Sequence, residues 1–213
     1  MTAVQDAPSI MTRLRDDTRA LHDAAEKSGF QQALFAGTLP RERFVESLAQ
    51  LFCVHRALEA HLRAAATTSP AIRAVVHDYQ FQEPHLRDDL QHFGRDADSA
   101  EPLPAARELI AAIDRAAREN PVALLGFHYV LEGSKNGAKF LAERVRRAYN
   151  LDGPAGTRSL DPYGPRQREL WGTFRQNMDA VGFSQAEMVA ILDAAAATFS
   201  GLTDLYNGMY SGN

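Results

Sequence analysis

The stretch Tyr129-Val-Leu-Glu-Gly-Ser-Lys-Asn-Gly-Ala-Lys-Phe-Leu141 lies within a segment, 126–147, that otherwise has the pattern of one helix. Gly133 and Gly137 are four residues apart in it, so they lie on the same helix face. Each glycine inside a helix costs about 1 kcal/mol relative to alanine, so two of them need a reason. With Ala138 they predict a face of bare backbone, which suits either close packing of another helix or a broad, flat ligand.

The same helical period runs along the whole chain. Apolar residues recur at steps of three and four from Phe44 to Leu62, and Ser184-Gln-Ala-Glu187 has the form of a capping box that begins a long last helix. Further helices are expected at about 10–26, 83–94, 104–118, 121–149 and 165–181, and strand signals are nearly absent. The sequence predicts one all-α domain, a helical bundle over residues 10–213, after a disordered tail over residues 1–9.

Composition indicates the general class of the protein. The 213 residues are 45% hydrophobic and 23% charged, which is ordinary for a soluble domain. The net charge of −4 gives no overall basic field for nucleic acid. Cys53 is the only cysteine, which excludes an internal disulfide and fits a reducing compartment. The start has no secretory signal and no apolar run approaches a membrane span, so we expect a cytoplasmic protein without a membrane partner.

Residues 14–26 hold the second informative pattern. Glu26 follows His22 by one helical turn, where its carboxylate can accept the ring N–H that a metal-ligating histidine leaves free. Arg15 and Arg19 precede His22 by seven and three residues, near the same face, and would suit an iron macrocycle with anionic groups at its edge. A histidine in a helix is more often a structural residue, so this pattern alone leaves both readings open.

Other candidate patterns are weaker. The pairs His55/Glu59 and His128/Glu132 repeat the same spacing, which is therefore not specific. A di-iron carboxylate bundle would show Glu-x-x-His on two helices, whereas this chain has none and only one Asp-x-x-His, at 89–92. Nucleotide-binding glycine loops, a serine-hydrolase elbow and zinc-spaced Cys/His sets are also missing from the sequence.

Taken together and in this order, the two patterns resemble the haem oxygenase family. Residues 14–26 are similar to the proximal helix of that family, and Gly133-Ser-Lys-Asn-Gly-Ala138 is similar to the glycine-rich kink of its distal helix, in a form seen in some bacterial members. Residues 174–178 and the helix after Ser184 are similar to its last two core helices. The resemblance covers about residues 10–208 and implies an all-α bundle that holds haem between a proximal and a kinked distal helix.

The resemblance also implies roles for single residues. His22 would be the axial ligand of the haem iron, and Glu26 would orient it. Gly133, Ser134 and Gly137 would be the catalytic positions, because the glycines bring backbone close to the haem and its bound dioxygen. The remaining cofactor-binding positions are Arg15, Arg19 and Arg175 toward the propionates, Phe199 on the distal-side wall, and His128 with the adjacent Tyr129 where the family has a tyrosine near the propionates.

The chain departs from the family pattern at three positions. Ser134 stands where many members have a carboxylate that orders water, Ala138 replaces a further glycine, and His128 replaces the tyrosine. A serine can hold a water molecule but supplies no charge. These departures leave the proton-delivery route open, and they make His128 a competing ligand that we rank below His22.

The reaction implied by the resemblance is oxidative opening of haem to biliverdin, with release of carbon monoxide and ferrous iron. Haem would be both substrate and cofactor, dioxygen the oxidant, and a ferredoxin, flavodoxin or reductase the external electron donor to a monomer or weak dimer. A haem carrier or storage protein of the same fold is the main alternative, and Ser134 keeps it open. A di-iron or thiaminase-like protein and a helical interaction domain have less support. The cleaved meso carbon, the donor and the physiological purpose stay open.

Overall fold

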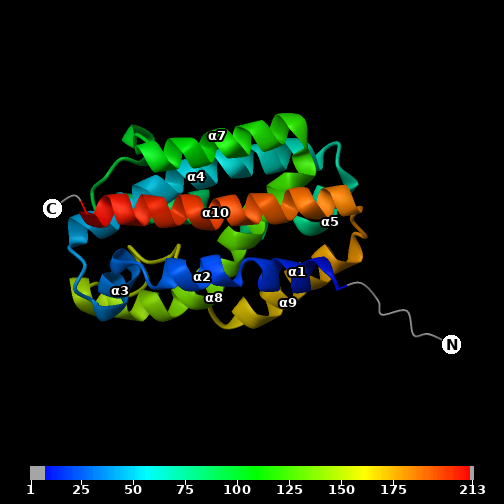
Figure 1. The fold of residues 1–213 in the computed structure, drawn as a ribbon. Helices are drawn as coiled ribbons and strands as arrows, with labels where there is room; N and C mark the ends of the chain where they lie inside the picture. Colours follow the sequence, from blue (N-terminus) through cyan, green and yellow to red (C-terminus); the bar gives the residue numbers. More distant parts are fainter. Residues whose placement is uncertain (1–7, 212–213) are drawn as a thin grey trace.

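Residues 8–211 are described in the computed structural model, and the helical period seen in the sequence becomes ten α-helices there, with no strand in this part of the chain (Figure 1). The α-helices are α1 (Ile10–Asp17), α2 (Arg19–Glu26), α3 (Gly29–Ala36), α4 (Arg41–Ala66), α5 (Pro70–Val75), α6 (Glu83–His92), α7 (Pro104–Glu119), α8 (Leu124–Tyr149), α9 (Gln167–Ala180) and α10 (Gln185–Ser211). Four short 3-10 turns, η1 (Asp78–Gln80), η2 (Ala97–Ser99), η3 (Pro121–Ala123) and η4 (Gly164–Arg166), complete the order. The all-α prediction is confirmed.

The last helix, α10, runs through the middle of the bundle. It packs against α7 on one side and against α8, α2 and α3 on the other, while α4 pairs with α7 and α6 (Figure 1). The predicted capping box begins this helix: the backbone N–H and hydroxyl of Ser184 donate to Glu187 Oε2 at 2.8 and 2.7 Å, and the Glu187 N–H donates back to the Ser184 hydroxyl at 3.3 Å. The central helix therefore starts where the sequence indicates.

The segment Gln185–Tyr210 is long and apolar enough to cross a membrane by length and composition. The expectation that no apolar run approaches that length is therefore wrong for α10. Its residues Ile191, Ala195 and Leu205 are buried in the hydrophobic core of the bundle. In this structure the apolar character of α10 serves packing against other helices, as expected of a central helix.

The first predicted helix, 10–26, is divided at Thr18. The backbone of Thr18 has φ −101° and ψ 0°, which ends α1, and its hydroxyl donates to the Leu14 carbonyl at 2.6 Å. Such local side-chain bonding competes with regular helix geometry. The predicted tail is also shortened at its end, because the Ser9 hydroxyl caps α1 by accepting from the Thr12 N–H at 3.3 Å. Residues 1–7 of that tail lie outside the described residues.

Gly126 marks a close approach of α8 to α10. A Cβ atom at this position would lie 2.1 Å from the Ile191 carbonyl oxygen, 2.8 Å from the Ala194 Cβ and 2.9 Å from the Ala195 backbone nitrogen. Two of these three neighbours are backbone atoms, which cannot move without shifting α10. Glycine is required here because the two helix backbones nearly touch.

We expect Gly126→Ala to lower the free energy of unfolding by about 1–3 kcal/mol, because the added methyl group overpacks the crossing. Alanine is the better helix former, so the clash must outweigh a gain of up to about 1 kcal/mol. Urea unfolding of the variant and the parent measures the difference. Gly208→Ala, in α10, is the control, because no described atom other than its chain neighbours and its own helix backbone lies within 4 Å of a Cβ there. Equal or higher stability of Gly126→Ala would contradict this account.

Candidate functional site

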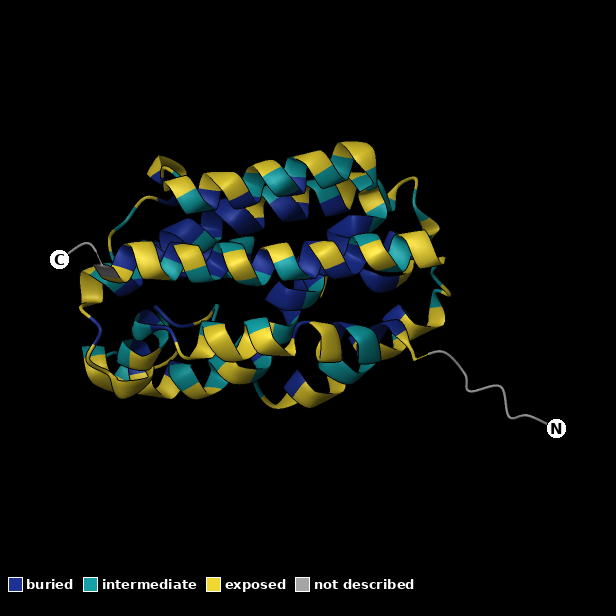
Figure 2. Ribbon diagram, in the orientation of Figure 1, coloured by how far each residue is buried: buried dark blue, intermediate teal, exposed yellow. Residues whose placement is uncertain are grey.

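Helix α2 presents an apolar face that its own bundle does not bury. All of its residues are described, none is buried, and Figure 2 shows the helix in the colours of exposed and intermediate residues. Leu21 and Ala25 are half-buried, and the His22 side chain is 53% exposed. α2 therefore leaves both apolar side chains and a histidine accessible from outside the core.

Helix α8 is held alongside α2 by contacts at both ends. At the α1–α2 junction, the hydroxyl of Tyr129 is close enough to Thr18 and Arg15 for both to influence its pKa. At the other end, the Arg144 guanidinium lies 3.8 Å above the ring of Phe35 in α3 and donates to its carbonyl oxygen at 3.2 Å. Because α2 runs from that junction to α3, it lies along the stretch of α8 between these two attachments.

The His22 ring lies between two carboxylates and one aromatic ring. Its Nε2 is 3.7 Å from Glu26 Oε1, and its Nδ1 is 3.8 Å from Asp23 Oδ1. Both distances are too long for hydrogen bonds, so the ring nitrogens stay available to a metal ion. Phe199 of α10 packs edge-on against the ring, with 5.7 Å between centroids. The sequence pointed to Glu26, and Asp23 is an addition from the structure. Phe199 was expected on the distal-side wall, but it lies against His22 instead.

The two glycines of α8 have different surroundings. Apart from its chain neighbours and the backbone of its own helix, no described atom lies within 4 Å of a Cβ placed on Gly137, and this residue is exposed. A Cβ on Gly133 would lie 3.3 Å from the edge of Trp171 in α9. The prediction of bare backbone therefore holds at Gly137, while close helix packing, the other reading, applies at Gly133.

Basic and phenolic groups gather at one end of this region. Burial raises the pKa of Tyr129, while the Thr18 hydroxyl and the charges of Arg15 and Arg175 act in the opposite direction. Arg15 and Arg175 are thus near enough to Tyr129 for their charges to act on its pKa, although the three residues belong to three helices and are far apart in the sequence. Guanidinium and hydroxyl donors in one place suit a carboxylate.

Two further residues of the predicted set, Arg19 and Ser134, lie on the surface. Arg15 donates to Asp16 at 2.7 Å, and Arg19 is near enough to the same carboxylate to lower its pKa, although less than Arg15 does. Ser134 is exposed, and its hydroxyl donates to the Leu131 carbonyl at 2.8 Å. Its oxygen can still accept a hydrogen bond from water.

The structure does not bring His128 together with these residues. Its side chain is buried on another face of α8, where Nε2 is 3.1 Å from Gln80 Oε1 and the ring packs edge-on against Phe174. Burial lowers the pKa of His128 to about 3, so the ring is neutral at pH 7. His128 acts here as an internal hydrogen-bonding residue.

A buried ion pair on α8 was missed by the sequence reading. Lys135 Nζ donates to Glu132 Oε2 at 2.6 Å, to the Gln80 carbonyl at 2.7 Å and to the Tyr163 hydroxyl at 3.0 Å. Tyr163 in turn donates to Glu132 Oε1 at 2.9 Å. Burial lowers the pKa of Lys135, and burial with the Glu132 charge raises that of Tyr163. The spacing of three residues is that of an ordinary surface pair, so nothing in the sequence signalled burial.

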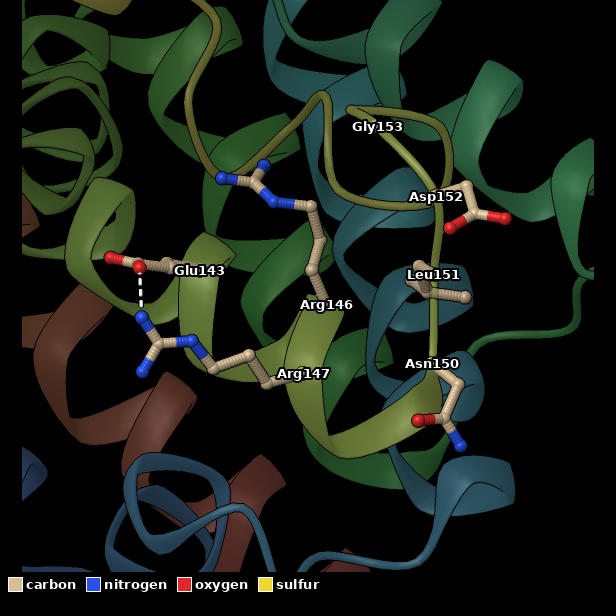
Figure 3. Close-up of a pocket in the computed structure, with 7 residues that line it drawn as sticks. All are labelled: Glu143, Arg146, Arg147, Asn150, Leu151, Asp152 and Gly153. Atoms are coloured by element: carbon tan, nitrogen blue, oxygen red, sulfur yellow. Dashed lines mark hydrogen bonds and ion pairs between the residues drawn. The ribbon is translucent and has the colours of Figure 1, made fainter.

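One surface pocket lies away from the predicted residues. It is a shallow hollow at the C-terminal end of α8, lined by Glu143, Arg146, Arg147, Asn150, Leu151, Asp152 and Gly153 (Figure 3). Arg147 pairs with Glu143, and Arg146 donates to the Thr157 hydroxyl at 3.1 Å. Acidic and basic groups balance each other in it, and none of the predicted site residues lines it.

The described residues contain no group of three or more His, Cys, Asp or Glu side chains that could hold a metal ion. In the Asp-x-x-His segment, the Asp89 carboxylate instead accepts from the backbone N–H groups of Arg158 and Ser159, both at 2.8 Å, and so fixes the loop before α9. A metal held by this chain would have to bring most of its own ligands, as an iron macrocycle does.

Comparison with known proteins agrees with the family resemblance seen in the sequence. The family model described as "Heme oxygenase" matches residues 9–207. The chain is 24% identical over 196 residues to a heme oxygenase of Pyropia yezoensis, covering 90% of this chain and 82% of the relative. The heme oxygenase structure from Leptospira interrogans matches with a TM-score of 0.87 and 22% identity, over 94% of this chain and 100% of that one. Heme oxygenase-2 of Synechocystis sp. PCC 6803, solved with heme and NO, matches with a TM-score of 0.88 and 23% identity, over 95% and 85%.

Proposed function

The chain belongs to the haem oxygenase family, and on that premise we propose that it opens haem oxidatively to biliverdin, with release of carbon monoxide and ferrous iron. One observation of the structure carries the proposal beyond the family match. An accessible histidine on α2 lies along a stretch of α8 whose Gly137 has no described atom within 4 Å of a Cβ position. A flat macrocycle needs a ligand on one side and little side-chain volume on the other.

The residues present fit a haem. His22 would ligate the iron through a ring nitrogen, and Glu26 or Asp23 would accept the proton of the other nitrogen and so orient the ring. When bound, haem supplies the iron at which dioxygen reacts and is also the ring that is cut. Phe199 would support the His22 ring from α10.

The polar end would hold the propionates. Arg15, Arg175 and the Tyr129 hydroxyl supply charged and neutral donors from three helices, and Arg19 adds charge nearby. Charge-assisted hydrogen bonds of this kind fix orientation as well as affinity. His128 is outside this proposal because its ring is buried and bonded to Gln80.

Proton delivery would depend on Ser134. Its hydroxyl already donates to the Leu131 carbonyl, so its oxygen is the atom that could hold a water molecule near the glycine face. Gly137 would leave the space that a reacting oxygen needs beside the ring. The absence of a side chain there also keeps acids and bases from touching the reacting atoms, and direct contact with them would favour O–O cleavage of the peroxidase kind.

The reaction consumes electrons, so a separate donor is part of the proposal. A ferredoxin, a flavodoxin or a reductase would supply them to a monomer or weak dimer in the cytoplasm. An absorption spectrum with added haem, followed by reductant under air, tests the activity. We expect the strong haem band to give way to biliverdin. Persistence of that band without biliverdin would favour a haem carrier instead.

We expect Gly137→Leu to bind haem but to lose roughly tenfold in ring opening, about 1.4 kcal/mol in the barrier, because the new side chain fills the reacting space. The haem Kd and the biliverdin yield per bound haem measure the two effects separately. Gly208→Leu, an exposed glycine of α10 without described neighbours, is the control and should leave both unchanged. An unchanged biliverdin yield in Gly137→Leu would show that Gly137 does not face the reacting oxygen.

A further inference from the structure

Trp171 is the only tryptophan of the chain, and α9 holds it against the face of α8 that has the glycines. The edge of its six-membered ring lies 3.3 Å from where a Cβ on Gly133 would be. Its ring stacks on the fully buried Phe174, with 5.3 Å between centroids and 15° between planes, and lies 6.0 Å from the Tyr129 ring. The side chain is therefore fixed by aromatic contacts on two sides.

Tyr129, Gly133 and Gly137 follow one another at four-residue steps along this face of α8. Tyr129 marks the basic end, Gly133 is covered by Trp171, and Gly137 is open. Trp171 thus lies between the basic end of this face, whose groups suit propionates, and Gly137, which leaves free space. Arg175 is one turn beyond Trp171 on α9. The same helix therefore carries both the aromatic side chain that covers Gly133 and a basic residue suited to a propionate.

We propose that Trp171 is a specificity-determining residue: it limits how the tetrapyrrole lies in its own plane against α8, and thereby selects which bridge carbon is attacked. This inference rests on the proposed function. The anchors Arg15 and Arg175 are long and flexible, so charge alone tolerates several rotations of a nearly symmetric ring. A rigid aromatic wall excludes those rotations that would bring the ring edge against Gly133.

The first test compares the parent with Trp171→Phe and Trp171→Ala. Proton NMR of the haem-loaded ferric cyanide complexes reports the orientation of the ring through its shifted methyl signals, without turnover. We expect one dominant set of signals in the parent and a second set in the variants, larger in Trp171→Ala. Trp171→Phe keeps an aromatic ring above Phe174, so it stays informative if the alanine variant folds poorly.

The second test analyses the biliverdin isomers of the same proteins by chromatography. We expect one main isomer from the parent and at least one further isomer from the variants, in proportion to the second NMR set. Gln176→Ala is the matched control, because Gln176 is exposed on the outer side of α9 and should change neither readout.

The outcomes separate the two proposals. A parent that binds haem and yields no biliverdin contradicts the proposed function, while the NMR comparison still tests Trp171. If all proteins yield biliverdin, and both Trp171 variants give the same isomer and the same methyl signals as the parent, the role of Trp171 is overturned. The proposed function is then left intact.

Discussion

In a His22→Ala variant, we expect haem to lose its nitrogen ligand from the protein and biliverdin production to fall to the background level. His22 is exposed on α2, with no hydrogen bond to either neighbouring carboxylate. Loss of a group that only orients a metal ligand costs about 10–100-fold, so loss of the ligand itself should cost more. The absorption spectrum of the ferric complex and the biliverdin yield measure the two consequences.

A second histidine serves as the control. His61 of α4 is half-buried and lies 2.7 Å from Asp114 of α7, and these two helices lie on the other side of α10 from α2 (Figure 1). His61→Ala should keep the spectrum and the yield of the parent. Added imidazole should restore part of the ligand spectrum to His22→Ala, because alanine leaves room for it. Normal activity of His22→Ala would contradict the assignment of His22 as the ligand of the haem iron.

Lys135→Ala should lower the free energy of unfolding by about 3–5 kcal/mol, the usual cost of removing one partner of a buried ion pair. The side chains of Lys135 and Glu132 are only 3% and 0% exposed. Without the ammonium group, the Glu132 carboxylate keeps only the Tyr163 hydroxyl as a bonded partner among the contacts described for it. Urea unfolding followed by circular dichroism measures the loss.

Two further proteins make that result interpretable. Arg166→Ala removes one partner of an exposed pair with the same spacing, to Glu169 at 2.9 Å, and should change the stability far less, because solvent screens the pair. The double variant Glu132→Gln/Lys135→Met removes both buried charges and should be more stable than Lys135→Ala. A loss for Lys135→Ala as small as that for Arg166→Ala would contradict a buried, mutually dependent pair.

The long elements of this fold could be predicted from the sequence because their apolar period extends over many turns. The helix from Phe44 and the capped helix after Ser184 are the clearest cases, and both are confirmed as α4 and α10. The short helices α3 and α5 were not predicted, since eight and six residues carry too little period to read. The break at Thr18 depends on one side-chain hydrogen bond, which no period reveals.

For the candidate site, the sequence indicates residues that share one helix and misses those that tertiary packing brings in. His22 with Glu26, and Gly133 with Gly137, are pairs at helical spacing, so their common face follows from the spacing alone. Trp171 reaches Gly133 from another helix, and nothing near either residue in the sequence signals that contact.

The burial of Glu132 and Lys135 also depends on tertiary packing and could not be predicted from the sequence. An acid and a base three residues apart are typical of an exposed helix surface, and the helical period places them on one face without saying which face is inside. Gln80 and Tyr163, which complete their hydrogen bonds, come from segments 55 and 28 residues away from Lys135. Only the packing of those segments over α8 makes the pair an internal one.

The single tryptophan has a practical consequence for optical measurements. All indole fluorescence of this protein originates at Trp171, on the wall of the candidate haem site. Haem absorbs strongly in the region where indole emits, so each bound molecule should quench that emission by energy transfer. A titration of the haem-free protein would then count occupied sites directly, and recovery of emission would follow the departure of the product.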